Sequence, residues 1–206
     1  MSEFPKQFFV TGTDTNVGKT VISALLTLGL GAAYWKPIQS GLDGITDTEF
    51  VRRVTQLDDS HFIPERFRLT QPLSPHAAAA IDHTTISLTD FHLPTTDKSH
   101  LIVEGAGGLM VPLNDRDLMI DLIRWLNLPV CLVARSSLGT INHTLLSIAQ
   151  LRRSQISILG VILNGEPNPS NRAAIAHYGQ VPILGEVDRL DAIDPSTLKT
   201  AFHHLT

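Results

Sequence analysis

Gly12-Thr13-Asp14-Thr15-Asn16-Val17-Gly18-Lys19-Thr20 is the stretch that decides the fold, because it has the composition of a phosphate-binding loop. The apolar residues 8–10 before it have strand character, and residues 21–26 after it can form a buried helix. In that context, successive backbone N–H groups and the helix N-terminus converge on a polyphosphate. Lys19 adds a positive charge, and the Thr20 hydroxyl is placed to bind Mg²⁺. The first glycine stands one position earlier than usual, so the alternative is a chance Gly/Thr-rich turn before a helix.

The composition is that of an ordinary globular protein, and it predicts one domain over residues 1–206. Hydrophobic residues make up 43% of the chain, and the formal net charge is -4 without a Lys/Arg run, so nothing favours a nucleic-acid partner. No apolar stretch approaches the ~20 residues of a membrane span, and no signal peptide is visible at residues 1–6. The single cysteine, Cys131, lies in an apolar run and fits a reducing compartment. We therefore expect a cytoplasmic protein without a membrane partner.

Apolar runs of strand length alternate with segments of helical spacing. The expected strands are residues 8–11, 32–36, 101–104, 130–134, 158–164 and 181–184. The clearest expected helices are residues 117–126, 141–152 and 170–178, with a shorter helix expected near Pro75. Continuous apolar strands between amphipathic helices indicate a mainly parallel sheet covered on both faces. The predicted fold class is therefore α/β, a P-loop NTPase-like sheet with helices on both faces.

Four expected strands end in chemically distinctive residues, and ligands of such sheets collect beyond the carboxyl ends of the strands. These ends are the phosphate loop, Lys36, Glu104 and Asn164. Glu104 can hold Mg²⁺ opposite the Thr20 hydroxyl, although it can also merely cap a turn. Lys36 can stabilise charge that develops during phosphoryl transfer, and a solvated lysine at a strand end is the alternative.

Asp47 and the histidines are less informative. Asp47 follows the flexible residues 41–46 and can supply a second magnesium carboxylate, but residues 46–49 also suit a helix start, where it would be an N-cap. The nine histidines lack metal-ligand spacing, and no Ser/His/Asp triad can be singled out. The chemistry is therefore predicted to depend on lysines and carboxylates around a phosphate site.

Taken together, these residues closely resemble the dethiobiotin synthetase family of the biotin pathway. The matching pieces, which keep the family order, are residues 10–20, 36–41 (Lys-Pro-Ile-Gln-Ser-Gly), 72–76 (Pro-Leu-Ser-Pro-His), 103–108 (Val-Glu-Gly-Ala-Gly-Gly), 138–143 (Leu-Gly-Thr-Ile-Asn-His), 161–164 (Val-Ile-Leu-Asn) and 182–186 (Pro-Ile-Leu-Gly-Glu). No single piece is decisive, but their combination is highly specific. One departure is Asn16, because this loop position is often acidic in the family.

The resemblance implies an ATP- and Mg²⁺-dependent ring closure on 7,8-diaminopelargonic acid that yields dethiobiotin, ADP and phosphate. One amine takes up CO₂ as a carbamate, ATP phosphorylates the carbamate oxygen, and the second amine attacks the resulting carbamic-phosphoric anhydride. Phosphorylation is needed because a carbamate would otherwise have to expel oxide. Catalysis then depends on positioning and on neutralising phosphoryl charge, which suits Lys19, Lys36 and magnesium.

The resemblance also assigns residues to each part of the site. It implies two catalytic lysines, Lys36 and Lys19, and a magnesium set of Thr20, Asp47 and Glu104. It implies nucleotide-binding positions at Asn16, Val17, Gly18, Lys19, Thr20, Val21, Asp47, Glu104, Gly105, Ala106, Gly107, Asn164, Gly165, Pro182 and Glu186, the last four on the adenine side. It implies substrate-binding positions at Ser40, Gly139, Thr140, Ile141 and Asn142. In the family the last four receive the substrate carboxylate from a neighbouring subunit, which implies a homodimer with shared sites.

Two readings from other classes remain as alternatives. A nucleotide-switched partitioning or septum-positioning ATPase has a related architecture, but its loop usually carries an additional lysine where this chain has Asp14. An amidotransferase-linked synthetase shares the ATP-binding half but needs a nucleophilic cysteine, and Cys131 is expected in a strand. Whether ATP turnover requires a diamine and bicarbonate, or responds to DNA or lipid, separates the first alternative from ring closure.

Overall fold

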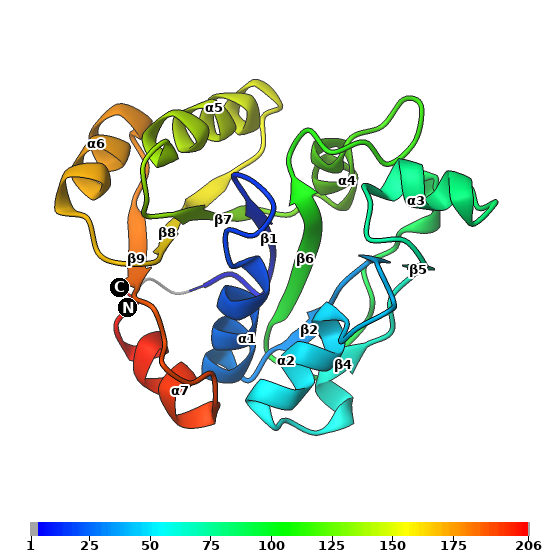
Figure 1. Ribbon diagram of the computed structural model, residues 1–206, viewed down its shortest axis with the longest axis horizontal. Helices are drawn as coiled ribbons and strands as arrows, with labels where there is room; N and C mark the ends of the chain where they lie inside the picture. Colours follow the sequence, from blue (N-terminus) through cyan, green and yellow to red (C-terminus); the bar gives the residue numbers. More distant parts are fainter. Residues whose placement is uncertain (1–3, 206) are drawn as a thin grey trace.

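The computed structural model describes residues 4–205, and a parallel sheet of seven strands runs through its centre (Figure 1). The strand order is β4-β2-β6-β1-β7-β8-β9. The strands are β1 (Gln7–Gly12), β2 (Ala33–Trp35), β4 (Phe62–Ile63), β6 (Leu101–Gly108), β7 (Val130–Arg135), β8 (Ile158–Asn164) and β9 (Ile183–Val187). All six neighbouring pairs are parallel. The predicted mainly parallel sheet is confirmed, and so are the six predicted strands, with shifts of a few residues at their ends.

The register of the strands places Lys36 and Glu104 level with each other across the sheet. Val10 of β1 pairs with Glu104 of β6, and Trp35 of β2 pairs with Val103 of β6. Lys36 therefore follows β2 at the level of Glu104, directly beside the loop that follows β1. Parallel strands bring these carboxyl ends to the same edge of the sheet.

Helices cover both faces of the sheet (Figure 1). One face is covered by α1 (Lys19–Leu30), α2 (Asp47–Thr55) and α7 (Pro195–His203). The other face is covered by α3 (Pro75–Ile81), α4 (Met119–Leu126), α5 (Thr140–Arg153) and α6 (Pro169–Gly179). Successive strand residues point to opposite faces of the sheet, as Phe8 and Phe9 do, and each face packs against an apolar cluster.

The segments before and after α2 form elements that the sequence did not predict. A second sheet pairs β3 (Ile38–Ser40), which precedes α2, in parallel with β5 (Phe67–Leu69), which follows it. Two 3-10 helices, η1 (Asp59–His61) and η2 (Leu88–Asp90), lie between α2 and β6. The strands β3 and β5 have three residues each, Ile-Gln-Ser and Phe-Arg-Leu, and neither contains a continuous apolar run that could be recognised. The short helix expected near Pro75 is α3, and Pro75 is its first residue.

Two further predictions have a structural outcome. Cys131 is buried in β7, as expected, and burial raises the pKa of its thiol to about 12. None of the helices described within residues 4–205 is both long enough and apolar enough to cross a membrane.

Candidate functional site

The loop between β1 and α1 has the conformation that a phosphate-binding loop needs. Gly18 is the N-cap of α1 at φ 92°, and it makes no side-chain cap, so the first N–H groups of the helix are not satisfied by a capping side chain. Lys19 begins the helix, and its Nζ donates to the Asp14 carbonyl at 3.0 Å, which folds the side chain back over the loop. Thr13 N donates to Val133 O of β7 at 3.0 Å and anchors the rising arm of the loop. The predicted strand, loop and helix are confirmed.

Asn164, at the carboxyl end of β8, supports this loop from the side. Its Nδ2 donates to the Val17 carbonyl at 3.0 Å, and a Cβ at Gly18 would lie only 2.0 Å from the same nitrogen. Gly18 is therefore required twice, for its positive φ and for the approach of Asn164. The structure thereby joins one predicted adenine-side residue to the phosphate loop.

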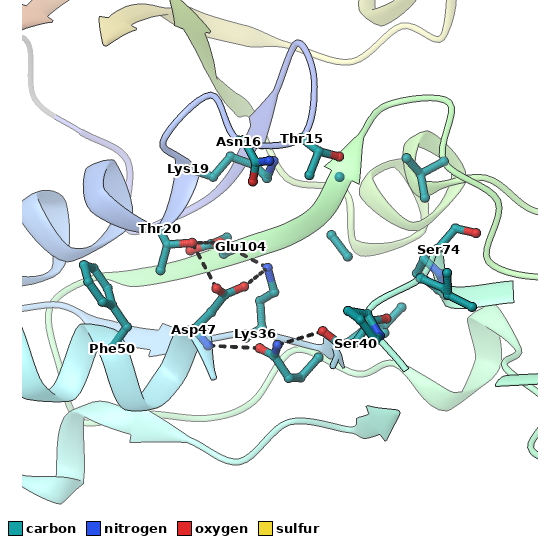
Figure 2. A pocket seen from close by; sticks show the side chains of 18 of the residues that line it. Thr15, Asn16, Lys19, Thr20, Lys36, Ser40, Asp47, Phe50, Ser74 and Glu104 are labelled. Atoms are coloured by element: carbon teal, nitrogen blue, oxygen red, sulfur yellow. Dashed lines mark hydrogen bonds and ion pairs between the residues drawn. The ribbon is translucent and has the colours of Figure 1, made fainter. Parts of the chain in front are cut away.

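Four side chains, from α1, α2, β6 and the residue that follows β2, converge beside the loop (Figure 2). Lys36 Nζ lies 2.6 Å from Asp47 Oδ2 and 3.1 Å from Glu104 Oε1, and it donates to Gly105 O at 2.9 Å. Thr20 Oγ1 lies 2.9 Å from Glu104 Oε1 and 3.2 Å from Asp47 Oδ1. The structure therefore brings together Lys36 and the predicted magnesium set.

Lys36 is held in its charged form by its neighbours. Burial is the largest influence and disfavours the ammonium, but Glu104 and Asp47 more than offset it and raise the pKa of Lys36. For Asp47, burial is again the largest influence and disfavours the carboxylate, but the charge and hydrogen bond of Lys36, with smaller contributions from Thr20 and Lys19, together outweigh it and lower the pKa of Asp47. We therefore interpret Lys36 as an ammonium and Asp47 as a carboxylate at neutral pH. The alternative that Lys36 is a solvated lysine at a strand end is wrong, because its side chain is buried.

Lys19 has the opposite balance. Burial, and then repulsion from Lys36, lower the pKa of Lys19, and the attraction of the nearby carboxylates does not restore it. The pKa values of the two lysines in this cavity are therefore shifted in opposite directions, because Lys36 directly contacts two carboxylates and Lys19 contacts a backbone carbonyl.

Tyr34 is a site residue that sequence reasoning missed. It is fully buried in β2, and its hydroxyl donates to Glu104 Oε2 at 2.9 Å. Burial, followed by the charge of Glu104, raises the pKa of Tyr34 well above its ordinary value, so the phenol stays a donor. The only signal in the sequence is a tyrosine two residues before Lys36, which reads as an ordinary strand residue until β2 is paired with β6.

Asp47 is not an N-cap, and that alternative was wrong. Thr46 caps α2, its side chain accepting from Glu49 N while the Glu49 carboxylate accepts from Thr46 N. Asp47 is the first helical residue, so its side chain is free to reach Lys36, and its own N–H donates to Gln39 Oε1 at 3.1 Å. Gln39 thus joins the β3 strand to the start of α2.

The donor set fits a small hard cation. Within residues 4–205, no cluster of three or more His, Cys, Asp or Glu side chains is suited to a metal. The candidate ligands are therefore the carboxylates of Asp47 and Glu104 and the hydroxyl of Thr20, which contacts both. Mg²⁺ is typically bound by one or two carboxylates, with substrate phosphates and water supplying the remaining oxygens. A set of Thr20, Asp47 and Glu104 beside a phosphate loop has that chemistry.

A cavity of about 1010 Å³ opens above this cluster. Its polar floor includes Lys19, Thr20, Lys36 and Glu104, and Ser40 lies on its wall with a buried hydroxyl that has no protein partner. The apolar part of its lining consists of Ile38, Ile45, Phe50, Pro72, Leu73, Pro75 and Val111. A ligand with a charged end and a hydrocarbon chain matches this mixed polar and apolar lining. Of the predicted nucleotide-binding positions, Asn16, Gly18, Val21, Ala106 and Gly107 also line the cavity, whereas Val17 and Gly105 do not.

The remaining predicted residues lie elsewhere along the sheet edge. Gly139 is the N-cap of α5 at φ 90° and, with Thr140, Ile141 and Asn142, it does not line the cavity of its own chain. Gly165 follows Asn164, and a Cβ there would lie 2.6 Å from Ser136 Oγ.

Glu186 lies at the carboxyl end of β9, one residue before the strand ends. Its Oε2 pairs with Arg172 Nε at 3.3 Å, and its buried Oε1 has no protein partner. Pro182 is separated from it, because it precedes β9 and its carbonyl accepts from Val161 N. Four residues of strand correspond to roughly 13 Å, so the four predicted adenine-side residues do not form one cluster.

Comparison with known proteins gives consistent relationships. A family described as an AAA domain matches residues 6–197. A Brucella ovis protein named ATP-dependent dethiobiotin synthetase BioD is 48% identical over 196 residues, or 95% of this chain and 92% of that protein. The protein of the same name from Paramagnetospirillum magneticum is 50% identical over 190 residues, or 92% and 91% of the two chains. Among solved structures, a ParA family ATPase from Chlorobium tepidum TLS matches 98% of this chain and 100% of its own with a TM-score of 0.59. At 14% identity, this last similarity concerns the fold alone.

Proposed function

This chain belongs to the dethiobiotin synthetase family, and we propose that it catalyses the ring closure of 7,8-diaminopelargonic acid with CO₂ and ATP to give dethiobiotin, ADP and phosphate. The observation that carries the proposal is the position of Lys36, 2.6 Å and 3.1 Å from two carboxylates beside the phosphate loop. A buried ammonium at the edge of a phosphate site stabilises an anionic phosphoryl transfer.

The reaction balances in three steps. One substrate amine forms an N–C bond to CO₂ and loses a proton, which leaves a carbamate. A carbamate oxygen attacks the γ-phosphorus, the bond to the β-phosphate oxygen breaks, and ADP leaves. The second amine attacks the carbamoyl carbon and loses a proton, the C–O bond breaks, and phosphate leaves with that oxygen. The second step brings the anionic carbamate against the anionic triphosphate, so the site must supply positive charge there.

The residues of the cavity supply the positive charge that phosphoryl transfer needs. Lys19, at the end of the loop, and Lys36, just beyond β2, both line the cavity, so their ammonium groups would act on the phosphoryl group from two different segments of the chain. Thr20, Asp47 and Glu104 would hold Mg²⁺, which when bound neutralises phosphate oxygens. The Ser40 hydroxyl, buried without a partner, is available to the carbamate or to a substrate amine.

The apolar lining residues of the cavity suit the rest of the proposed substrate. Diaminopelargonic acid has two adjacent amines, a hydrocarbon chain and a terminal carboxylate. With the amines near Lys36 and Ser40, the chain would lie along Ile45, Leu73 and Val111, which line the same cavity. On the nucleotide side, the unpartnered Oε1 of Glu186 is an acceptor that suits the exocyclic amine of adenine.

We further propose a homodimer in which the start of α5 completes the partner's site. Gly139 N-caps this helix with no side-chain cap, and free N–H groups at a helix N-terminus suit a carboxylate. Leu138 is 98% exposed and Leu146 of α5 is 62% exposed, which fits a surface that is covered by a second subunit. In one chain these residues do not reach the cavity, so the proposal requires a second copy.

The test is incubation with diaminopelargonate, ¹³C-bicarbonate and Mg-ATP, followed by mass detection of dethiobiotin. We expect a product one mass unit heavier than unlabelled dethiobiotin, formed in step with ADP, and formed about a hundredfold more slowly by Lys36→Ala. ADP formation that needs no diamine, but rises with DNA or lipid vesicles, would instead support a partitioning-type ATPase.

A further inference from the structure

We propose that Tyr34 is a positioning residue of the cation site: its hydroxyl holds one oxygen of Glu104, so that this carboxylate offers a single oxygen to the cation and favours Mg²⁺ over Ca²⁺. The inference rests on the magnesium site proposed above, with Thr20, Asp47 and Glu104 as its donors. Nothing in that proposal assigns a role to Tyr34.

The two oxygens of Glu104 have separate partners. Oε1 lies 2.9 Å from Thr20 Oγ1 and 3.1 Å from Lys36 Nζ, on the side of the cavity. Oε2 accepts the Tyr34 hydroxyl at 2.9 Å, away from those two groups. Glu104 and Tyr34 are each 0% exposed, so no water replaces the bond if it breaks. A buried hydrogen bond to a charged group is costly to lose.

The backbone holds Tyr34 in this place. Tyr34 pairs with Ile102 in the register of β2 and β6, two residues before Glu104, so both side chains point to the same face of the sheet. The ring lies in the apolar layer under α1, together with Phe8, Leu25 and Ile102. The phenol is therefore a rigid donor, and turning the carboxylate would leave Oε2 without a partner.

Asp47 lacks a corresponding restraint. Its side chain is 32% exposed, and its two oxygens lie near Thr20 and Lys36, both of which are groups of the site itself. Glu104 is consequently the ligand with a fixed orientation, and Asp47 is the one that can adjust.

This difference matters for the choice of cation. Mg²⁺ demands near-octahedral geometry with short bonds, whereas Ca²⁺ accepts six to eight oxygens and often takes both oxygens of one carboxylate. A carboxylate with one oxygen held in the core cannot turn to present both. Removing the Tyr34 hydroxyl frees Oε2 and should therefore help Ca²⁺ more than Mg²⁺.

The experiment measures cation binding without turnover. Free Mn²⁺ is followed by electron paramagnetic resonance in the presence of ADP, and Mg²⁺ or Ca²⁺ is added to compete. The variants are Tyr34→Phe and, in case its folding fails, Tyr34→Met. Tyr178→Phe is the matched control, because Tyr178 is the other tyrosine of the chain and is 69% exposed.

We expect the ratio of the Ca²⁺ and Mg²⁺ competition constants to move toward Ca²⁺ by about tenfold in Tyr34→Phe and to stay at the parent value in Tyr178→Phe. A lower melting temperature with an unchanged ratio would overturn the inference, because a merely structural bond changes stability alone. Glu104→Gln separates the two proposals. If it leaves Mn²⁺ binding intact, the magnesium site itself is wrong; if it weakens binding while Tyr34→Phe keeps the ratio, only the role of Tyr34 fails.

Discussion

Lys36 and Lys19 lie in the same cavity with different surroundings, and this difference determines what each can contribute. Lys36 has two carboxylate partners, at 2.6 Å and 3.1 Å, and its pKa is raised. Lys19 donates to the Asp14 carbonyl, and its pKa is lowered. At the scale of single residues, Lys36 is therefore a permanent charge, and Lys19 is one that alkaline solution removes first.

Lys36→Ala should lower turnover by about a hundredfold, or ~3 kcal/mol, and weaken ATP binding much less, because the lost contact acts on charge developing in the transition state. Unfolding should also become easier by about 3 kcal/mol, since the buried Glu104 carboxylate loses its ammonium. Steady-state kinetics and urea unfolding measure the two effects. Lys6→Ala, at an exposed position, is the control and should change neither. Turnover within about twofold of the parent would remove the catalytic assignment.

Nucleotide affinity should fall as the pH is raised toward the lowered pKa of Lys19, because only the protonated amine attracts phosphate. The sign follows from burial, which disfavours the charged form and moves deprotonation to lower pH than for an ordinary lysine. Calorimetric titration with ADP across the alkaline range measures it. Lys19→Arg should remove the decline, since arginine stays protonated there. The same decline in both proteins would mean that another group titrates.

The phosphate loop and β8 act together at the scale of elements. Asn164 at the end of β8 donates to the Val17 carbonyl, and Gly18 leaves it the space to do so. The loop is therefore held in shape by a strand that is not its sequence neighbour. This arrangement makes the loop's conformation a tertiary property.

Gly18→Ala should abolish measurable nucleotide binding, because a Cβ would lie 2.0 Å from Asn164 Nδ2 and displace the loop from β8. Gly31→Ala is the matched control, since Gly31 also has a positive φ, 57°, but no atom within 4 Å of a Cβ. The control should lose roughly 1–2 kcal/mol of stability from backbone strain and keep its affinity for ADP. Equal losses of affinity in both variants would contradict the role given to the Asn164 contact.

The start of α5 and the cavity belong to different regions of one chain. Gly139 lies beyond β7, whereas Lys36 lies beyond β2, three positions away in the strand order. At the scale of the whole molecule, the proposed contact of both with one substrate therefore needs two subunits. The exposed Leu138 and Leu146 are the apolar surface that such an assembly would cover.

Mixing two inactive variants should restore activity if the site is shared. Lys36→Ala removes the lysine, and Gly139→Pro removes the helix entrance, because proline cannot adopt the φ of 90° found there. After exchange of subunits at equal amounts, about a quarter of all sites would contain both intact halves, so about a quarter of the parent activity should return. Mass spectrometry of the intact assembly must show mixed dimers. Mixed dimers without activity would mean that the α5 entrance is structural.

Much of the architecture could be predicted from local patterns. The six predicted strands, including the three-residue β2, lie within continuous apolar runs. The loop of residues 12–20 identifies its own strand and helix, because their periodicity is set by neighbouring residues. The elements β3, β4 and β5 could not be predicted in this way. Each has only two or three residues, and its strand conformation depends on pairing partners distant in the sequence.

The sequence by itself determined the phosphate loop, the parallel α/β sheet and the choice of Lys36 and Glu104 as site groups, since each depends on residue type at fixed spacing. The strand expected to end at Glu104 continues to Gly108, so Glu104 lies inside β6. Only the tertiary structure decided what those groups contact. Strand register placed Tyr34 against the far oxygen of Glu104, and the Thr46 cap freed Asp47 to reach Lys36. Such contacts join residues tens of positions apart, and their distances follow from pairing and packing, which no local pattern contains.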